Sequence, residues 1–180
     1  MAKLTTDVLD ELEDARVCQL PFTLYGRCRA IEGRIRTVRC FEDNALLKAM
    51  LSAPSSGDVM VIDGGGSLRT ALIGDMIASS AIGNGWAGVI AYGAIRDSAQ
   101  INALDFHVKS LGTNPRKSAK RGDGEFDVPI VFGNIRFVPG EYLYSDEDGI
   151  VVVSARYPAE LPLVSSGHYD DSSPHARARL

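Results

Sequence analysis

The sequence predicts a single α/β domain with a central βαβ unit and a β-rich second half. Three observations lead to this fold class. With 45% hydrophobic and 23% charged residues, the 180-residue chain has the composition of a globular domain that buries a core. An apolar run, a glycine turn, a helical stretch and a second apolar run follow one another between residues 59 and 95. After them, short β-type runs alternate with turns rich in Gly, Pro and Asp.

In the first part of the chain we expect two helices with a strand between them. The opening segment spaces Leu and Val between acids, which predicts a short amphipathic helix with Thr5 or Thr6 as N-cap. Residues 33–40 alternate as in a strand, and residues 44–51, which read NALLKAML, predict the second helix.

The centre of the chain predicts the βαβ unit. Residues 59–63 read VMVID and form a buried strand that runs into the triple glycine at 64–66. A helix is expected over residues 75–82, and Gly-Asn-Gly at 83–85 ends it. Residues 88–95, GVIAYGAI, predict the next buried strand, and a crossover of this kind favours parallel pairing.

The second half predicts strands over residues 106–111, 128–132, 135–138 and 150–153, with a hairpin turn at 146–149. No repeat or long linker divides the chain, so residues 1–160 are assigned to one domain. Residues 161–180, which contain several Pro and Ser and little periodicity, are expected to form a flexible tail.

Charge and composition narrow the functional classes. With 19 basic and 23 acidic residues the net charge is −4, which disfavours direct binding of nucleic acid or anionic membranes. The N-terminal segment carries acids and no apolar core, so we do not expect it to be a targeting peptide, and no apolar run approaches the roughly 18 residues of a membrane span. Cys18, Cys28 and Cys40 lack metal-ligand or redox spacing and are interpreted as reduced thiols of a cytoplasmic protein.

A candidate site lies at one edge of the predicted βαβ unit. Asp75 stands at the start of the helix and Arg96-Asp97 at the end of the next strand, and ligands usually bind at this edge of an α/β sheet. The backbone N–H groups of Gly74, Asp75, Met76 and Ile77 would point into this edge and favour binding of a carboxylate. Together, these backbone N–H groups and the guanidinium group of Arg96 would form a binding site for a 2-oxo acid.

The same residues suggest a metal. The carboxylate of Asp97 offers hard oxygen ligands suited to Mg²⁺ or Mn²⁺, whereas Asp75 can hold a water of the metal shell. Two carboxylates and one arginine would make a Lewis-acid site.

Plainer interpretations compete with these. An Arg-Asp pair after a strand is common on surfaces, and an Asp at a helix start often serves only as a cap. The triple glycine lacks a nucleotide-binding register and is interpreted as a tight turn. The basic run Arg116, Lys117, Lys120 and Arg121 is interpreted as a solvated face, and the three histidines are too scattered to form a metal cluster.

Five segments of the chain match a known family in order: TVRCFEDNALLK (37–48), VIDGGGSLRTALIGDMIA (61–78), GVIAYGAIRD (88–97), LGTNPRKS (111–118) and YSDEDGIVV (144–152). On these segments the chain resembles the regulator of ribonuclease activity A family, which includes the 4-hydroxy-4-methyl-2-oxoglutarate aldolases. The resemblance implies a swivelling β/β/α-type domain that assembles as a homotrimer or a dimer of trimers, with sites near the subunit interfaces.

The resemblance also implies an activity. Aldolases of the family carry an Asp, then twenty residues, then Arg-Asp, a pattern that this chain has as Asp75, Arg96 and Asp97. By that match the backbone of Gly74 to Ile77 and the Arg96 side chain bind substrate, and Asp97 holds Mg²⁺ or Mn²⁺, partly through waters. The implied reaction cleaves 4-hydroxy-4-methyl-2-oxoglutarate to two pyruvates, and oxaloacetate decarboxylation passes through the same enolate.

Two other functions remain as alternatives. The first is a regulator that binds and inhibits ribonuclease E without significant catalysis, as the family name records. Members of that kind can lack the metal-holding acid, so Asp97 favours the enzyme. The second is methyl transfer to a demethylated menaquinone. It is disfavoured because the second strand of the βαβ unit ends in Arg96, where a nucleotide-binding fold would need an acid.

Overall fold

The computed structural model describes residues 2–154 of the chain, and the predicted tail at 161–180 lies outside this part. Its elements follow in this order: α1 (Thr5–Glu11), β1 (Arg16–Val17), β2 (Thr23–Tyr25), β3 (Ile31–Arg39), α2 (Ala45–Leu51), β4 (Val59–Asp63), β5 (Ala71–Ile73), α3 (Asp75–Gly83), β6 (Gly88–Ile95), α4 (Ser98–Asn102), β7 (His107–Thr113), β8 (Glu125–Phe126), β9 (Ile130–Phe132), β10 (Ile135–Phe137), β11 (Tyr142–Ser145) and β12 (Ile150–Val153).

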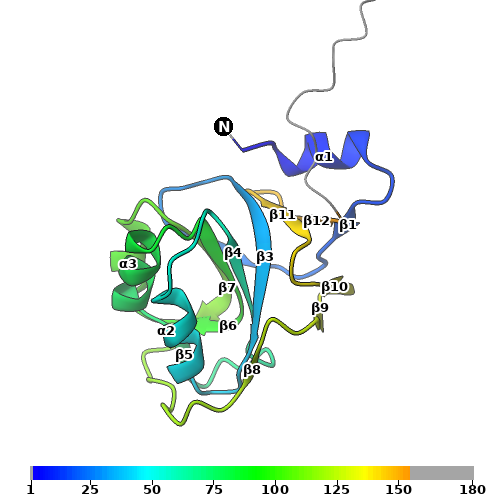
Figure 1. Cartoon of the computed structure of the whole chain (residues 1–180). Coiled ribbons are helices and arrows are strands. Elements are labelled where there is room, and N and C mark those ends of the chain that lie inside the picture. The colour runs from blue at the N-terminus through cyan, green and yellow to red at the C-terminus, as the bar shows by residue number, and fades with distance from the viewer. Residues whose placement is uncertain (1, 155–180) are drawn as a thin grey trace, which may run out of the picture.

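One large mixed sheet organises these elements (Figure 1). Its main path runs β1-β12-β11-β3-β4-β6-β7-β2, with β5 beside β6 and β8 beside β3. The central pairs β3–β4, β4–β6, β5–β6 and β6–β7 are parallel, and the outer pairs are antiparallel. Because parallel strands share their direction, β5, β6 and β7 all end at the same edge of the sheet.

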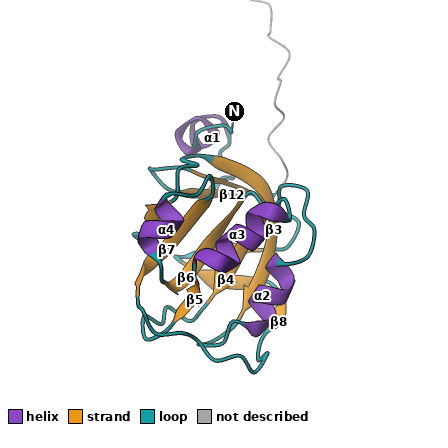
Figure 2. Cartoon of the chain, turned by 90° about the vertical axis from the view of Figure 1, so that its left-hand side faces the viewer, coloured by secondary structure: helices purple, strands orange, loops and turns teal. Residues whose placement is uncertain are grey.

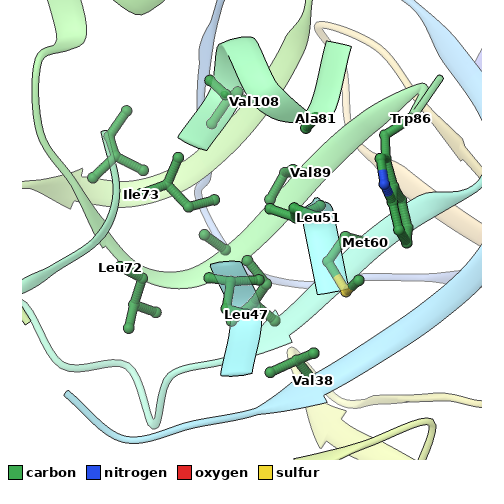
Figure 3. Close-up of a cluster of buried hydrophobic side chains, with 14 of the residues drawn as sticks. Val38, Leu47, Leu51, Met60, Leu72, Ile73, Ala81, Trp86, Val89 and Val108 are labelled. Atoms are coloured by element: carbon green, nitrogen blue, oxygen red, sulfur yellow. The ribbon is translucent and has the colours of Figure 1, made fainter. Parts of the chain in front are cut away.

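Helices α2, α3 and α4 cover one face of the parallel strands (Figure 2). Alternate side chains of β4, among them Met60, point to this face, where Leu47 and Leu51 of α2 and Ala81 of α3 meet them (Figure 3). All four side chains are fully buried. Burial of one leucine stabilises the fold by roughly 1.5–3 kcal/mol, so this layer fixes the helices that border the site.

The opposite face of the sheet carries the β9–β10 hairpin. Val59 and Val61, which alternate with Met60 along β4, share a hydrophobic cluster with Phe132 and Phe137 of the hairpin. The two phenyl rings lie 4.5 Å apart between centroids. Hairpin, sheet and helices thus form three layers, which is the β/β/α arrangement predicted for the domain.

The predicted βαβ unit is confirmed. Strand β4, helix α3 and strand β6 occupy the expected residues, and β4 and β6 pair in parallel with Met60 opposite Val89. Strand β5, which has three residues and lies between the glycine turn and α3, was not predicted. The predicted hairpin turn at residues 146–149 is also confirmed, since β11 and β12 pair as antiparallel neighbours around it.

The N-cap prediction for the first helix was wrong. Leu4 occupies the N-cap position of α1, and no side chain caps the helix. Thr5 instead donates its hydroxyl to Asp146 Oδ1 at 2.8 Å and its backbone N–H to Oδ2 at 2.7 Å. The hydroxyl therefore ties α1 to the β11–β12 turn, a long-range contact that local sequence cannot reveal.

A buried polar network lies at the start of β7, which is the opposite edge of the sheet from the end of β5. His107, at the start of β7, is fully buried between the Cys28 carbonyl at 3.0 Å and Ser145 Oγ at 2.9 Å. Burial lowers the pKa of His107 to about 4, although the hydrogen bond to Cys28 opposes the shift. The imidazole is therefore neutral near pH 7, with Nδ1 donating to the carbonyl and Nε2 accepting from the serine.

Two smaller findings concern the cysteines and membranes. Cys18, Cys28 and Cys40 are free thiols, in line with the sequence interpretation. Among the described residues, no helix has the length and apolar character needed to cross a membrane.

We predict that His107 makes the protein less stable in mild acid. Because its folded pKa of about 4 lies below the roughly 6.5 of an unfolded histidine, the unfolded state takes up the proton first as the pH falls. The free energy of unfolding should fall by about 3 kcal/mol between about pH 6.5 and about pH 4 from this group. Urea denaturation of the wild type and His107→Phe should show a smaller loss in the variant, and equal losses would contradict the assignment.

Candidate active site

A cavity of about 370 Å³ opens where α2, the start of α3 and the end of β6 meet. Its size is that of a small-molecule site. The side chains and backbone that line it come from four segments: Asn44, Lys48 and Ser52 around α2; Ala71, Gly74, Asp75, Met76, Ile77 and Ser80 around β5 and α3; Arg96 after β6; and Lys117, Ser118 and Lys120 from the loop after β7.

The structure brings the predicted site residues together. Gly74, Asp75, Met76, Ile77 and Arg96 all line the cavity. Asp97 lies next to it, directly behind Gly74. The pairing that achieves this is the one missed from sequence, since β5 runs parallel to β6 and Ile73 O accepts a hydrogen bond from the Arg96 N–H at 2.9 Å.

Gly74 is in close contact with both charged side chains. A Cβ at this position would lie 2.6 Å from Asp97 Oδ2 and 3.1 Å from Arg96 Nε. Arg96 Nε and Asp97 Oδ2 are themselves 3.3 Å apart. The absence of a side chain at Gly74 therefore leaves room for an ion pair directly beneath the first turn of α3.

Asp97 has two unusual features. It adopts a left-handed backbone conformation with φ of 55°, which is uncommon for a residue other than glycine and is often found at functional sites. Its Oδ2 atom is buried and has no hydrogen-bond partner among the described residues. Its ion pair with Arg96 Nε at 3.3 Å is not a hydrogen bond, so this carboxylate oxygen can still take a cation as a ligand.

This oxygen fits the divalent metal that the family resemblance implies. Mg²⁺ and Mn²⁺ prefer carboxylate oxygen and usually keep several waters. Within residues 2–154, no group of three or more His, Cys, Asp or Glu side chains could hold a metal. Asp97 would therefore be the protein ligand from this part of the chain, with waters and substrate filling the other positions.

Asp75 is the first residue of α3 and does not act as its N-cap, which is Gly74. Its Oδ1 atom accepts a hydrogen bond from the Met76 N–H at 2.8 Å. The first intrahelical bond to Gly74 O comes from Ala78, so the N–H groups before it lie in the turn that has no helical acceptors. The backbone N–H groups of Asp75 and Ile77, together with the helix dipole, can bind an anion in the cavity.

The basic loop is solvent-exposed at Arg116, Lys117, Lys120 and Arg121, as interpreted from the sequence, but two of these residues also border the cavity. Lys117 and Lys120 line the cavity, and Lys48 from α2, which sequence reasoning did not single out, joins them. The loop follows β7, whose parallel pairing with β6 brings its end to the same edge as Arg96. That neighbour relation is the signal that could have found the two loop lysines.

Asp43 fixes the far end of this loop. Its buried carboxylate accepts hydrogen bonds from the N–H groups of Ala45, Arg121 and Gly122. Burial raises the pKa of Asp43, but these three donors outweigh it and hold the pKa below its ordinary value. The charged carboxylate thus ties the loop to the start of α2.

The triple glycine forms a turn, as predicted. Gly65 and Gly66 have φ values of 65° and 68°, a conformation that glycine adopts without strain. Gly64 and Gly66 both donate to the Tyr92 carbonyl, at 3.0 and 3.2 Å. The turn is thereby held against β6, and none of these glycines lines the cavity.

Residues 5–152 match the family model described as RraA-like, Aldolase/RraA. The chain belongs to the RraA-like family.

Solved structures of related proteins agree with this RraA-like assignment. A Geobacillus kaustophilus protein described as an S-adenosylmethionine:2-dimethylmenaquinone methyltransferase is 45% identical, with a TM-score of 0.86 over 89% of this chain and 100% of that one. The RNA-processing inhibitor RraA of Thermus thermophilus is 39% identical, with a TM-score of 0.85 over 88% and 97%. Streptomyces coelicolor RraAS2, described as an unusual member of the RNase ES inhibitor RraA family, is 29% identical, with a TM-score of 0.67 over 83% and 77%.

We predict that Gly74→Ala leaves the RraA-like fold intact but disables the cavity. The new methyl group would displace the ends of the Arg96 and Asp97 side chains and no backbone, so the free energy of unfolding should change by about 1 kcal/mol or less. Binding of pyruvate in the presence of Mg²⁺, measured by calorimetry, should weaken by at least about tenfold. Gly83→Ala, in the same helix with open space around it, is the matched control and should bind like wild type. Wild-type binding by Gly74→Ala would show that the close packing is unimportant.

Proposed function

We propose that this RraA-like protein is a divalent-metal lyase that cleaves 4-hydroxy-4-methyl-2-oxoglutarate to two pyruvates and decarboxylates oxaloacetate through the same enolate. The observation that carries the proposal is the position of Arg96 and of Asp97 Oδ2, which pairs with Arg96 but accepts no hydrogen bond, beneath the first turn of α3 and beside a small-molecule cavity. The family contains both aldolases and ribonuclease regulators, so the activity rests on this geometry and the family resemblance together.

The substrate would bind through its 2-oxo acid end. Its carboxylate fits the free N–H groups at the start of α3, where the helix dipole favours negative charge. Arg96 presents a planar, permanently charged fork to the same space and can donate to the carboxylate and the 2-oxo oxygen. Both contacts orient the C3–C4 bond within the cavity.

The reaction removes the proton from the C4 hydroxyl and breaks the C3–C4 bond, leaving one pyruvate and the enolate of the other. Arg96 stabilises the negative charge that develops on the enolate oxygen. A divalent cation held by Asp97 would supply Lewis-acid stabilisation of the same charge. Asp75, which is half-buried in the wall of the cavity, would position a water that returns a proton to the enolate.

The charge of the cavity argues against methyl transfer. S-adenosylmethionine carries a positively charged sulfonium, whereas four cationic side chains and the single carboxylate of Asp75 line this cavity. The similarity to the Geobacillus protein shows that the two chains share a fold. Calorimetry with S-adenosylmethionine would test whether this chain binds that cofactor.

The alternative function is inhibition of ribonuclease E through protein binding. It is supported by the likeness to the Thermus RNA-processing inhibitor. A pull-down with purified ribonuclease E tests it, and binding that survives loss of Asp97 would assign the two activities to separate surfaces. We also propose a cytoplasmic homotrimer or hexamer, which light scattering of the purified protein would test.

We predict that Asp97→Asn abolishes metal-dependent turnover. Asparagine keeps the size of the side chain but removes its charge, so metal affinity and pyruvate release should both fall by at least about 100-fold. Pyruvate release is measured with Mg²⁺, with Mn²⁺ and after chelation. Exposed Asp105→Asn, which breaks only a surface pair with Arg27, is the control. Undiminished metal-dependent release from Asp97→Asn would overturn the proposed metal site.

We predict that Arg96→Lys lowers turnover by about 100-fold although the positive charge remains. Lysine is a point charge and cannot donate two parallel hydrogen bonds to a carboxylate or an enolate. Steady-state kinetics should show the loss mainly in kcat, with metal affinity close to that of wild type. An Arg96→Lys enzyme with normal kcat would remove Arg96 from the mechanism.

A further inference from the structure

Strand β5 is held to β6 by an irregular pairing. Ala71 lies opposite Ala94 and Ile73 lies opposite Ile95, so the register shifts by one residue within a strand of three. A shift of this kind leaves so short a strand weakly defined along its neighbour. Because Gly74 follows directly on β5, the position of the start of α3 depends on further anchors.

Glu42, in the turn between β3 and α2, anchors the segment that leads into β5. Its Oε1 atom accepts hydrogen bonds from Ser67 Oγ and from Arg69 Nε, each at 2.6 Å. Both donors lie between the triple-glycine turn and β5. The hydrogen bond from Arg69, together with that from Ser67, lowers the pKa of Glu42, so the carboxylate is charged near pH 7. We call this carboxylate and its two donors the Glu42 anchor.

The backbone of Glu42 has an uncommon conformation. Its φ of 52° lies in the left-handed region, which favours glycine. A residue with a side chain keeps such a conformation only where its surroundings fix it. Here the surroundings are the two donors to the carboxylate and the Ala119 N–H, which donates to Glu42 O at 2.8 Å. Ala119 belongs to the loop after β7, so Glu42 joins this loop to the segment before β5.

Two further side chains hold β5 itself to the same group of segments. Asn44 Nδ2 donates to Leu72 O at 3.0 Å, and Ser118 Oγ donates to Ala71 O at 2.9 Å. The Asn44 N–H donates to Ala119 O at 3.1 Å, which joins the turn before α2 to the loop after β7. Three of the four segments that line the cavity are therefore connected through residues 42–44.

We propose that Glu42 is a positioning residue of the active site, which sets the place of β5 along β6 and so the place of the α3 N–H groups beside Arg96 and Asp97. Its effect on a ligand is indirect, because Glu42 and Arg69 both lie outside the lining of the cavity. The inference rests on the proposed function only where pyruvate serves as the probe.

The Glu42 anchor should act locally. The Arg69 side chain is 71% exposed, and ion pairs at the surface add little to global stability. Arg69 is nonetheless held from a second side, since its Cζ lies 5.7 Å from the centroid of the Phe41 ring. Loss of the anchor should therefore loosen β5 without unfolding the domain.

Hydrogen exchange tests the position of β5 without any ligand. The Arg96 N–H, which donates to Ile73 O, reports on the end of the β5–β6 pairing. Glu42→Gly keeps the turn conformation but removes the carboxylate, so exchange of this amide should become at least about tenfold faster. The Cys18 N–H, bonded to Ile150 O at the other end of the sheet, is the internal reference and should exchange as in the wild type. Unchanged exchange at Arg96, or an equal increase at both amides, would overturn the proposal.

Three further variants separate the anchor from a general loss of structure. Glu42→Gln keeps the length and the accepting oxygen, and should exchange within about threefold of the wild type at the Arg96 N–H. Arg69→Met should reproduce the effect of Glu42→Gly, and the double variant should be no worse than Glu42→Gly alone. Independent effects that multiply in the double variant would contradict the anchor. The matched control is Glu147→Gly, which breaks a surface pair with Arg29 and should leave the Arg96 amide unchanged.

Pyruvate binding tests the consequence for the site. By calorimetry in Mg²⁺, Glu42→Gly and Arg69→Met should bind pyruvate at least about tenfold more weakly, and Glu42→Gln within about threefold of the wild type. Affinity for Mg²⁺ alone should stay within about twofold in all three variants, because Asp97 follows β6, whose pairing with β4 does not involve the anchor. Faster exchange with unchanged pyruvate affinity would refute the positioning role.

The two measurements fail independently. If the wild type binds no pyruvate, the proposed function is wrong, and exchange of the Arg96 N–H alone decides whether Glu42 sets the place of β5. If the wild type binds pyruvate and Glu42→Gly leaves this exchange unchanged, the proposed function stands and the role of Glu42 is wrong.

Discussion

The parallel pairing of β5 with β6 is the constraint on which the site depends. Through the hydrogen bond from Arg96 N–H to Ile73 O it aligns the end of one strand with the start of the next helix. Gly74 then lies against the side chains of Arg96 and Asp97 with no room for a Cβ. The start of α3, with N–H groups that have no helical acceptor, and the Arg96 guanidinium therefore reach one cavity, and the Asp97 carboxylate lies immediately behind them.

Buried carboxylates have two different roles in this protein. Asp43 accepts hydrogen bonds from the loop after β7. Asp146 accepts hydrogen bonds from α1 and from the β11–β12 turn. These donors lower the pKa of both groups in spite of burial, so the charged form stabilises the fold. Asp97 differs because its buried Oδ2 accepts no hydrogen bond within the described residues. The hydrogen bonds of the protein thus satisfy the two stabilising carboxylates, whereas Asp97 Oδ2 has only its ion pair with Arg96.

The arrangement of charge also separates this cavity from the rest of the surface. Elsewhere many arginines pair with nearby acids, as Arg36 does with Asp127, and such pairs cancel at short range. Around the cavity the cations outnumber the acids and lie on elements joined by backbone hydrogen bonds. A small anionic substrate would gain from this local field, while the acidic chain as a whole would repel polyanions.

The sequence by itself determined the central architecture and the core of the site. Strands β4 and β6 and helix α3 were predictable because their apolar patterns and glycine boundaries are local signals. Asp75 and Arg96 followed from them, since helix starts and parallel strand ends share one edge. Strand β5 was not predictable, because a three-residue strand carries no periodicity and exists only through its pairing with β6.

Tertiary structure alone decided the remaining features. The hydroxyl of Thr5 could have capped α1 by every local rule, yet Asp146, far away in the chain, accepts it. Lys117 and Lys120 look like ordinary loop lysines in the sequence, and Lys48 like the polar face of a helix. They belong to the cavity because β7 pairs with β6 and the loop is tied to α2. Local pattern fixes which segments are helices and strands, whereas the convergence of side chains depends on pairings between distant residues that no local pattern encodes.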